Sequence, residues 1–257
     1  MEGFLKIWDY SILGKIGVIS GLISLVITVF LGLPQLIKVI REKQTKNVNF
    51  VSFWIFNIGL LLWIVYATLL PGSLLPVVIA NLLSVIIYCV MIFFLYFYKS
   101  WKTNASKMLG MISISIVLII MCLISSILTI IWLIDQTRTI DEHILITINT
   151  PWMQILLSSI IPAFTCLSFI PQLISSFKRK SFAGVSVVFS FILMLNNITW
   201  WLYWFTVAKY YDPAFPISFI LTLSWQALSV IIYLIQLTAV LAFNFKEKNI
   251  KKQEDKI

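Results

Sequence analysis

Residues 34–37 and residues 171–174 both read Pro-Gln-Leu-Ile, and the chain around the first copy resembles the chain around the second. The same offset of 137 residues pairs further identical residues: Thr28 with Thr165, Lys43 with Lys180, Trp63 with Trp200, and Tyr66 with Tyr203. Farther along, residues 83–88 (Leu-Ser-Val-Ile-Ile-Tyr) return as residues 228–233, at an offset of 145. A segment that recurs at a nearly fixed offset indicates an internal structural repeat. The chain is therefore predicted to contain two copies of one folding unit.

The composition is that of an integral membrane protein. Of the 257 residues, 60% are hydrophobic and 11% are charged, and the mean hydropathy is +0.99. Soluble domains carry roughly 45–50% apolar and about 25% charged residues. A helix that crosses a bilayer needs about 20 apolar residues, and unpaired backbone groups in lipid exclude irregular segments. Seven spans meet this length, near residues 12–40, 50–70, 74–98, 109–134, 153–177, 186–208 and 214–243.

The basic residues predict how the chain is oriented in the membrane. Fifteen of the 19 lysine and arginine residues lie in alternate loops or in the tail, namely Lys38, Arg41, Lys43, Lys46, Lys99, Lys102, Lys107, Lys178, Arg179, Lys180, Lys246, Lys248, Lys251, Lys252 and Lys256. By the positive-inside rule these segments face the cytoplasm. The N-terminus is therefore predicted outside and the C-terminus inside, in a bacterial cell membrane. We assign the net charge of +9 to topology and lipid headgroups, with no nucleic-acid partner.

The repeat also predicts the arrangement of the helices. A unit of three helices ends on the opposite side of the membrane, so a second copy placed directly after it would be inverted. The unmatched span near residues 109–134 restores the direction, which makes the two units parallel repeats. We expect an all-α membrane protein with seven transmembrane helices, in which two parallel three-helix bundles are joined by a linker helix. The predicted parts are a first bundle (residues 1–100), the linker helix and its loops (101–150), a second bundle (151–245) and a charged cytoplasmic tail (246–257), disordered after Phe245.

These features resemble the PQ-loop repeat transporter family, which includes the SWEET sugar facilitators, the half-size bacterial SemiSWEETs and the cystinosin-like lysosomal exporters. The resemblance rests on the two Pro-Gln repeats, a basic turn after each, a Trp-x-x-Tyr in the second helix of each unit, and the unmatched fourth helix. It covers nearly the whole chain. The turn at residues 178–186 is similar to the family's usual turn, whereas residues 44–49 are a diverged copy.

Each Pro-Gln pair is predicted to mark a hinge. Pro34 and Pro171 each remove a backbone hydrogen bond and clash with the carbonyl group four residues earlier. The carboxamide of the adjacent Gln35 or Gln172 can bond a freed carbonyl. A static kink is the alternative, but two copies at matched depth favour a hinge that opens and closes a cytoplasmic gate. The family resemblance implies the same role.

Four residues are candidates for binding a solute: Trp63, Asn81, Trp200 and Gln226. The two indoles lie at matched depths, and the two carboxamides precede the matched segments 83–88 and 228–233. A carboxamide in a membrane helix is costly unless it faces protein or water. Indoles stack on sugar rings and carboxamides bond hydroxyl groups. The resemblance implies that a Trp and an Asn at these positions line the solute site, although Gln226 departs from the usual Asn. Bonding between helices is the alternative role for the carboxamides.

Other polar and aromatic residues in the spans leave alternatives open. Tyr66 and Tyr203 lie one turn beyond the tryptophans, where they form either an outer gate or part of an aromatic belt at the membrane surface. Asn57, Asn196 and Asn197 either pack between helices or add contacts to the solute pathway.

The spans predict a passive mechanism because their central parts contain no Asp or Glu. Proton-coupled transport usually needs a buried titratable group. The leading hypothesis is therefore a facilitator that moves a small neutral polar solute, a sugar, by alternating access. Two alternatives stay open: a proton-coupled amino-acid exporter of the cystinosin type, for which Asp212 is the candidate carboxylate, and a receptor or scaffold without transport.

Catalysis, cofactors and metals are not expected. The single histidine, His143, cannot complete a Ser-His-Asp or Cys-His set, and no glycine-rich phosphate loop is present. Cys89, Cys122 and Cys166 lie inside the spans and suit neither a disulfide framework nor a metal site. The expected partners are a small-molecule solute and the lipid bilayer, and a homo-oligomer is left open.

Overall fold

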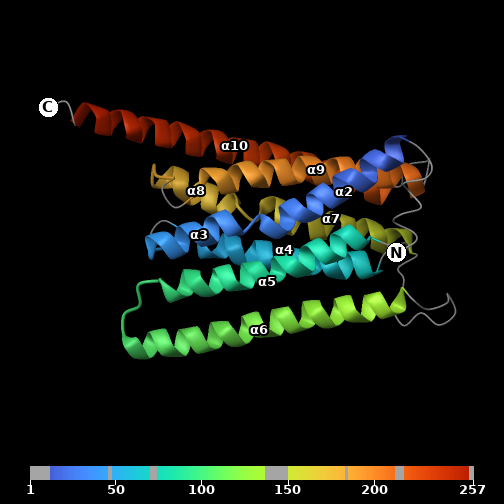
Figure 1. Ribbon diagram of the computed structural model, residues 1–257, viewed down its shortest axis with the longest axis horizontal. Coiled ribbons are helices and arrows are strands. Elements are labelled where there is room, and N and C mark those ends of the chain that lie inside the picture. The colour runs from blue at the N-terminus through green and yellow to red at the C-terminus, as the bar shows by residue number, and fades with distance from the viewer. Residues whose placement is uncertain are drawn as a thin grey trace.

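The structure is a computed structural model, and it describes residues 12–45, 48–69, 74–136, 150–182, 185–211 and 217–254. All regular structure in these ranges is helical (Figure 1). The helices are α2 (Ile12–Phe30), α3 (Leu33–Glu42), α4 (Phe50–Leu69), α5 (Leu75–Phe97), α6 (Asn104–Asp135), α7 (Pro151–Leu167), α8 (Ile170–Lys178), α9 (Val187–Tyr211) and α10 (Ile217–Glu254). His143 and Asp212 lie outside the described residues.

Seven helical segments are long and apolar enough to cross a membrane, which confirms the seven predicted spans. Two of these segments consist of two helices each, α2 with α3 and α7 with α8. Large apolar side chains are exposed along the outer faces of the bundle. On α6, for example, the side chains of Ile119 and Ile120 are 58% and 48% exposed. Such faces suit contact with lipid rather than with water.

Two helix ends differ from the prediction. Helix α6 begins five residues earlier than expected because Thr103 and Ser106 cap it reciprocally, with backbone-to-hydroxyl distances of 3.1 and 3.2 Å. Helix α10 continues to Glu254, so the prediction of disorder after Phe245 is wrong for these residues. Extending an existing helix avoids the cost of nucleation, and the Lys, Glu and Gln residues of the tail favour helix.

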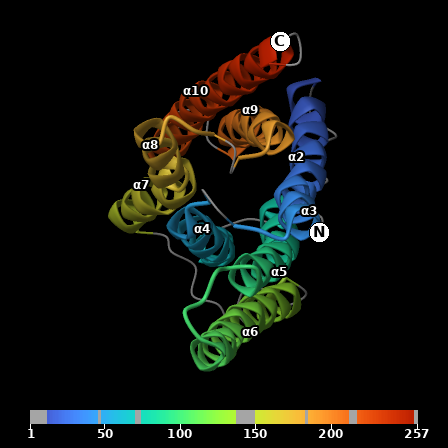
Figure 2. The ribbon, with the colours of Figure 1, turned by 90° about the vertical axis from the view of Figure 1, so that its left-hand side faces the viewer.

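The two halves of the chain have the same internal arrangement. In the first half α5 contacts both α2 and α4, and in the second half α10 contacts both α9 and α7. The halves meet through two interfaces, α2 with α9 and α4 with α7. Helix α6 packs on the outside of α5 and α4, as Figure 2 shows. The division of the chain into bundles, linker and tail stays a prediction.

Both first helices are interrupted just before their Pro-Gln pair. Helix α2 ends at Phe30 and α7 ends at Leu167, the residues whose carbonyl groups lie four positions before the prolines. Pro34 and Pro171 then occupy the first turn of α3 and α8, where a missing backbone N–H costs nothing. Where a bend within one helix was predicted at each proline, the structure has a break between two helices. Helices α3 and α8 lie at the same end of the molecule (Figure 1), which we call the Pro-Gln end.

Candidate functional site

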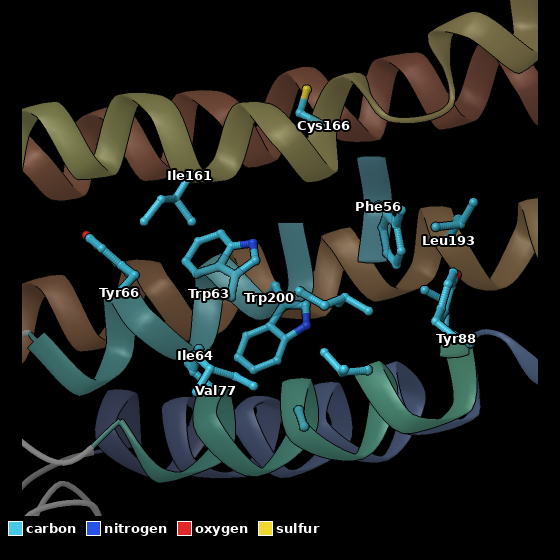
Figure 3. Close-up of a cluster of buried hydrophobic side chains, with 14 of the residues drawn as sticks. Phe56, Trp63, Ile64, Tyr66, Val77, Tyr88, Ile161, Cys166, Leu193 and Trp200 are labelled. Atoms are coloured by element: carbon cyan, nitrogen blue, oxygen red, sulfur yellow. The ribbon is translucent and has the colours of Figure 1, made fainter. Parts of the chain in front are cut away.

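The two indoles of the repeat bond across the interface between the halves. The Trp63 indole N–H on α4 donates to the Thr165 hydroxyl on α7 at 3.2 Å. The Trp200 indole N–H on α9 donates to the Thr28 hydroxyl on α2 at 2.8 Å. Each tryptophan thus reaches the first helix of the opposite half, and the two bonds are related by the internal repeat. Figure 3 shows the two indoles between the helices.

All four predicted binding residues line one cavity, of about 40 Å³. The Asn81 carboxamide nitrogen donates to the Val77 carbonyl of its own helix at 2.7 Å, which turns its oxygen away from that carbonyl. The Gln226 carboxamide oxygen is buried and has no hydrogen-bond partner among the described residues. The structure therefore brings Trp63, Asn81, Trp200 and Gln226 together, and their role in binding stays a prediction.

The cavity is polar but uncharged. Its described lining residues are Thr28, Phe56, Leu60, Trp63, Val77, Asn81, Thr165, Asn196, Asn197, Trp200, Trp204, Gln226 and Tyr233. None of these side chains carries a charge, so hydrogen bonds and ring stacking are the interactions available to a bound molecule. The volume has room for a few water molecules.

Aromatic rings close the cavity toward the end opposite the Pro-Gln end. Trp204 stacks on Trp63 with ring centroids 5.7 Å apart, and it contacts Tyr66 and Tyr203 at 6.3 and 5.5 Å. The two tyrosines are only 2% and 1% exposed. Side chains of an interfacial aromatic belt reach the lipid headgroups, whereas these rings lie inside the bundle. The outer-gate role of Tyr66 and Tyr203 stays a prediction with this burial in its favour.

A second aromatic group closes the cavity toward the Pro-Gln end. It consists of six buried rings, those of Phe53, Phe56, Tyr88, Phe169, Phe189 and Tyr233. Phe169 is at the centre, with its ring centroid 5.4 Å from Phe56, 5.2 Å from Phe189 and 6.2 Å from Tyr233. Phe169 also lies in the break between α7 and α8. In Figure 3, Phe56 and Tyr88 lie on one side of the indoles and Tyr66 on the other. The structure is therefore closed at both ends of the cavity.

The Pro-Gln pairs bond across the halves as well. The Gln172 side-chain oxygen accepts the backbone N–H of Asn49 at 2.5 Å, and the Gln35 side-chain oxygen accepts the backbone N–H of Ser186 at 3.3 Å. Asn49 and Ser186 are themselves related by the offset of 137 and directly precede α4 and α9. Each glutamine therefore holds the start of the second helix of the opposite half. The hinge role of Pro34, Gln35, Pro171 and Gln172 stays a prediction.

The three uncertain asparagines separate into two groups. Asn196 and Asn197 line the cavity, and the Thr28 hydroxyl donates to the Asn196 carboxamide oxygen at 2.7 Å. Asn57 is fully buried elsewhere, where its nitrogen lies 3.5 Å from the Cys89 sulfur and 3.7 Å from the Met121 sulfur. Asn57 therefore packs between α4, α5 and α6 rather than lining the cavity.

Several lining residues were not predicted from the sequence. Thr28 and Thr165 are identical at the repeat offset, so the repeat could have indicated them. Trp204 has no such signal, because Ala67 occupies the matched position. Within the described residues, no group of three or more His, Cys, Asp or Glu side chains could hold a metal ion.

Sequence comparison finds one matching protein family and two relatives for this chain. The family model for the PQ loop repeat matches the chain twice, at residues 16–75 and 154–210, with one Pro-Gln pair in each match. An uncharacterised protein of Methanocaldococcus jannaschii is 34% identical over 70 residues, which cover 73% of that protein and 27% of this chain. The sugar transporter SemiSWEET of Leptospira biflexa is 28% identical over 74 residues, which cover 85% of that protein and 29% of this chain.

Seven apolar helical segments, a repeated three-helix arrangement and a cavity lined by uncharged side chains between the halves are features of a multi-pass membrane transporter. This chain belongs to the PQ-loop repeat family and is a membrane transporter of the PQ-loop class.

Proposed function

We propose that this protein is a facilitator for a small neutral polar solute, and that the solute is a sugar. The proposal depends chiefly on one observation. Two indoles, each bonded to a threonine of the opposite half, and two carboxamides line one cavity whose described lining residues are uncharged. Indole faces cover the apolar faces of a sugar ring, and carboxamides exchange hydrogen bonds with its hydroxyl groups. The similarity to a SemiSWEET sugar transporter supports the same solute class.

Alternating access in this proposal uses the two interruptions at the Pro-Gln pairs as hinges. Bending at Pro34 and Pro171 parts the bonds from Gln35 and Gln172 and moves Phe169 away from the aromatic group beneath the cavity. Movement of Tyr66 and Tyr203 opens the other end. We further propose that the Pro-Gln end faces the cytoplasm of a bacterial cell, because the basic residues of alternate loops favour that side.

The test is uptake of radiolabelled glucose into proteoliposomes without a pH gradient. The wild-type protein should equilibrate glucose across the membrane, and the double variant Trp63→Ala/Trp200→Ala should reduce uptake to the level of empty liposomes. The control is Trp201→Ala, because the Trp201 ring stacks on Phe205 and does not line the cavity. Glucose uptake that survives loss of both indoles would contradict the proposal.

The same vesicles distinguish the alternative of proton-coupled amino-acid export. That mechanism predicts uptake that requires an imposed pH difference and is abolished by Asp212→Asn. A receptor or scaffold predicts no uptake of any solute. The facilitator predicts glucose uptake that is unchanged by a proton ionophore.

A further inference from the structure

Gln236 lies on α10 between the cavity and the Pro-Gln end. It is on the same face of α10 as Gln226 and Tyr233, which both line the cavity, and it is one turn beyond Tyr233. One turn beyond Gln236, Val240 is buried in a cluster with Phe182 and Val185 at the Pro-Gln end. The Gln236 side chain is 1% exposed. The Gln236 carboxamide is thus buried inside the helix bundle, on the Pro-Gln side of the cavity.

Of the two polar atoms in the Gln236 carboxamide, only the nitrogen has a hydrogen-bond partner among the described residues. Its nitrogen donates to the Ser190 hydroxyl at 3.0 Å. The Ser190 hydroxyl donates its proton to the Ser186 carbonyl at 3.1 Å, so it cannot also donate to the Gln236 oxygen. The Gln236 oxygen has no hydrogen-bond partner in the part of the chain that the structure describes. Buried polar atoms are rarely left unpaired in folded proteins, so this oxygen is available to accept a hydrogen bond from a donor that enters the site.

Packing does not require polar residues at these positions, as the first half demonstrates. The residues related to Gln236 and Ser190 by the repeat are Met91 and Phe53, both apolar and buried. Among the described residues, four buried side-chain atoms have no hydrogen-bond partner: the oxygens of Gln226, Gln236 and Asn57, and the Tyr88 hydroxyl, which lies on α5 one turn before Met91. Three of these atoms, those of Tyr88, Gln226 and Gln236, lie on the matched helices α5 and α10, and the fourth, that of Asn57, lies on α4.

The polar pair is also connected to the contact that closes the Pro-Gln end. The backbone N–H of Ser186 donates to the Gln35 side chain, and its carbonyl accepts the Ser190 hydroxyl that orients Gln236. Loss of the bond between Gln35 and Ser186 would therefore free the start of α9, which lies next to Gln236.

We propose that Gln236 and Ser190 form a second solute station between the cavity and the Pro-Gln end, in which the Gln236 oxygen accepts a hydrogen bond from a solute hydroxyl group. The station belongs to the second half alone. The inference rests on the proposed facilitator function, and it adds a binding residue that acts on only one side of the membrane.

The test compares glucose entry from the two sides in right-side-out and inside-out membrane vesicles. The variant Gln236→Met places in the second half the residue that the first half has at the related position, Met91. It should raise the KM for entry from the Pro-Gln side about 3- to 10-fold, the equivalent of one hydrogen bond. The KM for entry from the other side should change less than about twofold. The maximal rate from the Pro-Gln side should rise with its KM, because a passive carrier must keep the ratio of the two equal in both directions.

Met91→Leu is the matched control, since it conserves volume at the related position and should leave both KM values unchanged. If Gln236→Met does not fold, Ser190→Ala removes the partner that orients Gln236 and should shift the same KM by a smaller factor. A KM that changes equally from both sides, or from neither side, overturns the inference while the wild-type glucose uptake leaves the proposed function intact. A wild-type protein that does not transport glucose overturns both. An increase confined to the Pro-Gln side supports the second station.

Discussion

The interface between α2 and α9 and the interface between α4 and α7 occupy equivalent places in the two halves, yet they are held by different chemistry. In the first interface the Thr28 hydroxyl bonds the Asn196 side chain. In the second, Gly59 stands in place of Asn196, and the Thr165 hydroxyl bonds a carbonyl of its own helix. Both interfaces contain a bond from an indole to a threonine hydroxyl, but only the first adds a bond from that threonine to the opposite half. At the matched position of the second interface, Gly59 instead lets the two helices approach closely.

The two Pro-Gln pairs differ in the same way. Gln172 accepts the Asn49 N–H through its side chain, and its backbone N–H donates to the Ser52 hydroxyl at 3.0 Å. The bond from Ser186 to Gln35 is longer, at 3.3 Å, and Phe189 takes the place of Ser52. A repeat therefore fixes where contacts occur, while single substitutions decide how strong each contact is.

The largest effect is expected from Gly59→Val. A Cβ atom at Gly59 would lie 2.8 Å from the Thr165 methyl carbon and 3.2 Å from the Thr165 backbone nitrogen, and the backbone cannot move aside without separating α4 from α7. The unfolding free energy in detergent should fall by about 3 kcal/mol, the upper part of the usual range for overpacking. Asn196→Ala, at the matched position, should cost about 1 kcal/mol for the lost bond to Thr28. Equal losses in the two variants would show that the interfaces do not differ as described.

The next effect concerns the closed Pro-Gln end. In a Cys89→Ala/Cys122→Ala background, Cys166 is the remaining thiol, and it is buried on α7. Its labelling by a small maleimide should accelerate about 10-fold in Gln172→Ala and about 3-fold in Gln35→Ala, because the shorter bond stabilises the closed state more. Labelling that is faster in Gln35→Ala would reverse the order of the two contacts.

A smaller difference is expected between the two tryptophans. Trp200→Phe and Trp63→Phe keep a ring and remove the indole N–H. The KM for glucose should rise about 5-fold in Trp200→Phe and about 2-fold in Trp63→Phe. The reason is that the bond from Trp200 to Thr28 is shorter, at 2.8 Å, than the bond from Trp63 to Thr165, at 3.2 Å. In addition, Thr28 donates to Asn196, a second residue that lines the cavity, and linked hydrogen bonds strengthen one another. Identical KM values would mean that the linked bond contributes nothing to the site.

The smallest effect is expected on α6, which has no counterpart in either repeat. Ile119 is 58% exposed on its outer face, so Ile119→Ala should change the unfolding free energy by less than about 0.5 kcal/mol. The measurement is thermal unfolding in detergent at two protein concentrations. A large loss of stability that depends on concentration would instead show that this face packs against another copy of the chain.

Much of the fold could be predicted because its signals are local. Lipid requires helices of a minimum length, so continuous apolar runs gave seven spans that the structure confirms. A proline inside an apolar span disturbs the helix around it, so Pro34 and Pro171 indicated irregularities near Phe30 and Leu167, although Pro162 lies inside the continuous helix α7. The end of α10 was not predictable from charge, because a helix that is already formed extends through polar residues.

The candidate site was predictable only where the repeat placed residues in register. Matched positions in two equivalent units must lie at matched depths, and so Trp63 with Trp200 and Asn81 with Gln226 could be proposed together. Residues without a counterpart gave no such signal. In the sequence, Trp204, Asn196 and Asn57 share one feature, since each is a large or polar residue inside an apolar span. Of these three, Trp204 and Asn196 line the cavity and Asn57 does not.

The seven spans, the prolines that disturb two of them and the pairing of equivalent residues can be read from the sequence, because each follows from local composition or from the offset between the copies. Which half each side chain bonds depends on the folded arrangement. The indole of Trp63 reaches Thr165 and the carboxamide of Gln172 reaches Asn49, and such partners are set by how the two bundles are packed together. Spacing along one chain cannot specify that packing, since it depends on the shapes of two surfaces that are distant in the sequence.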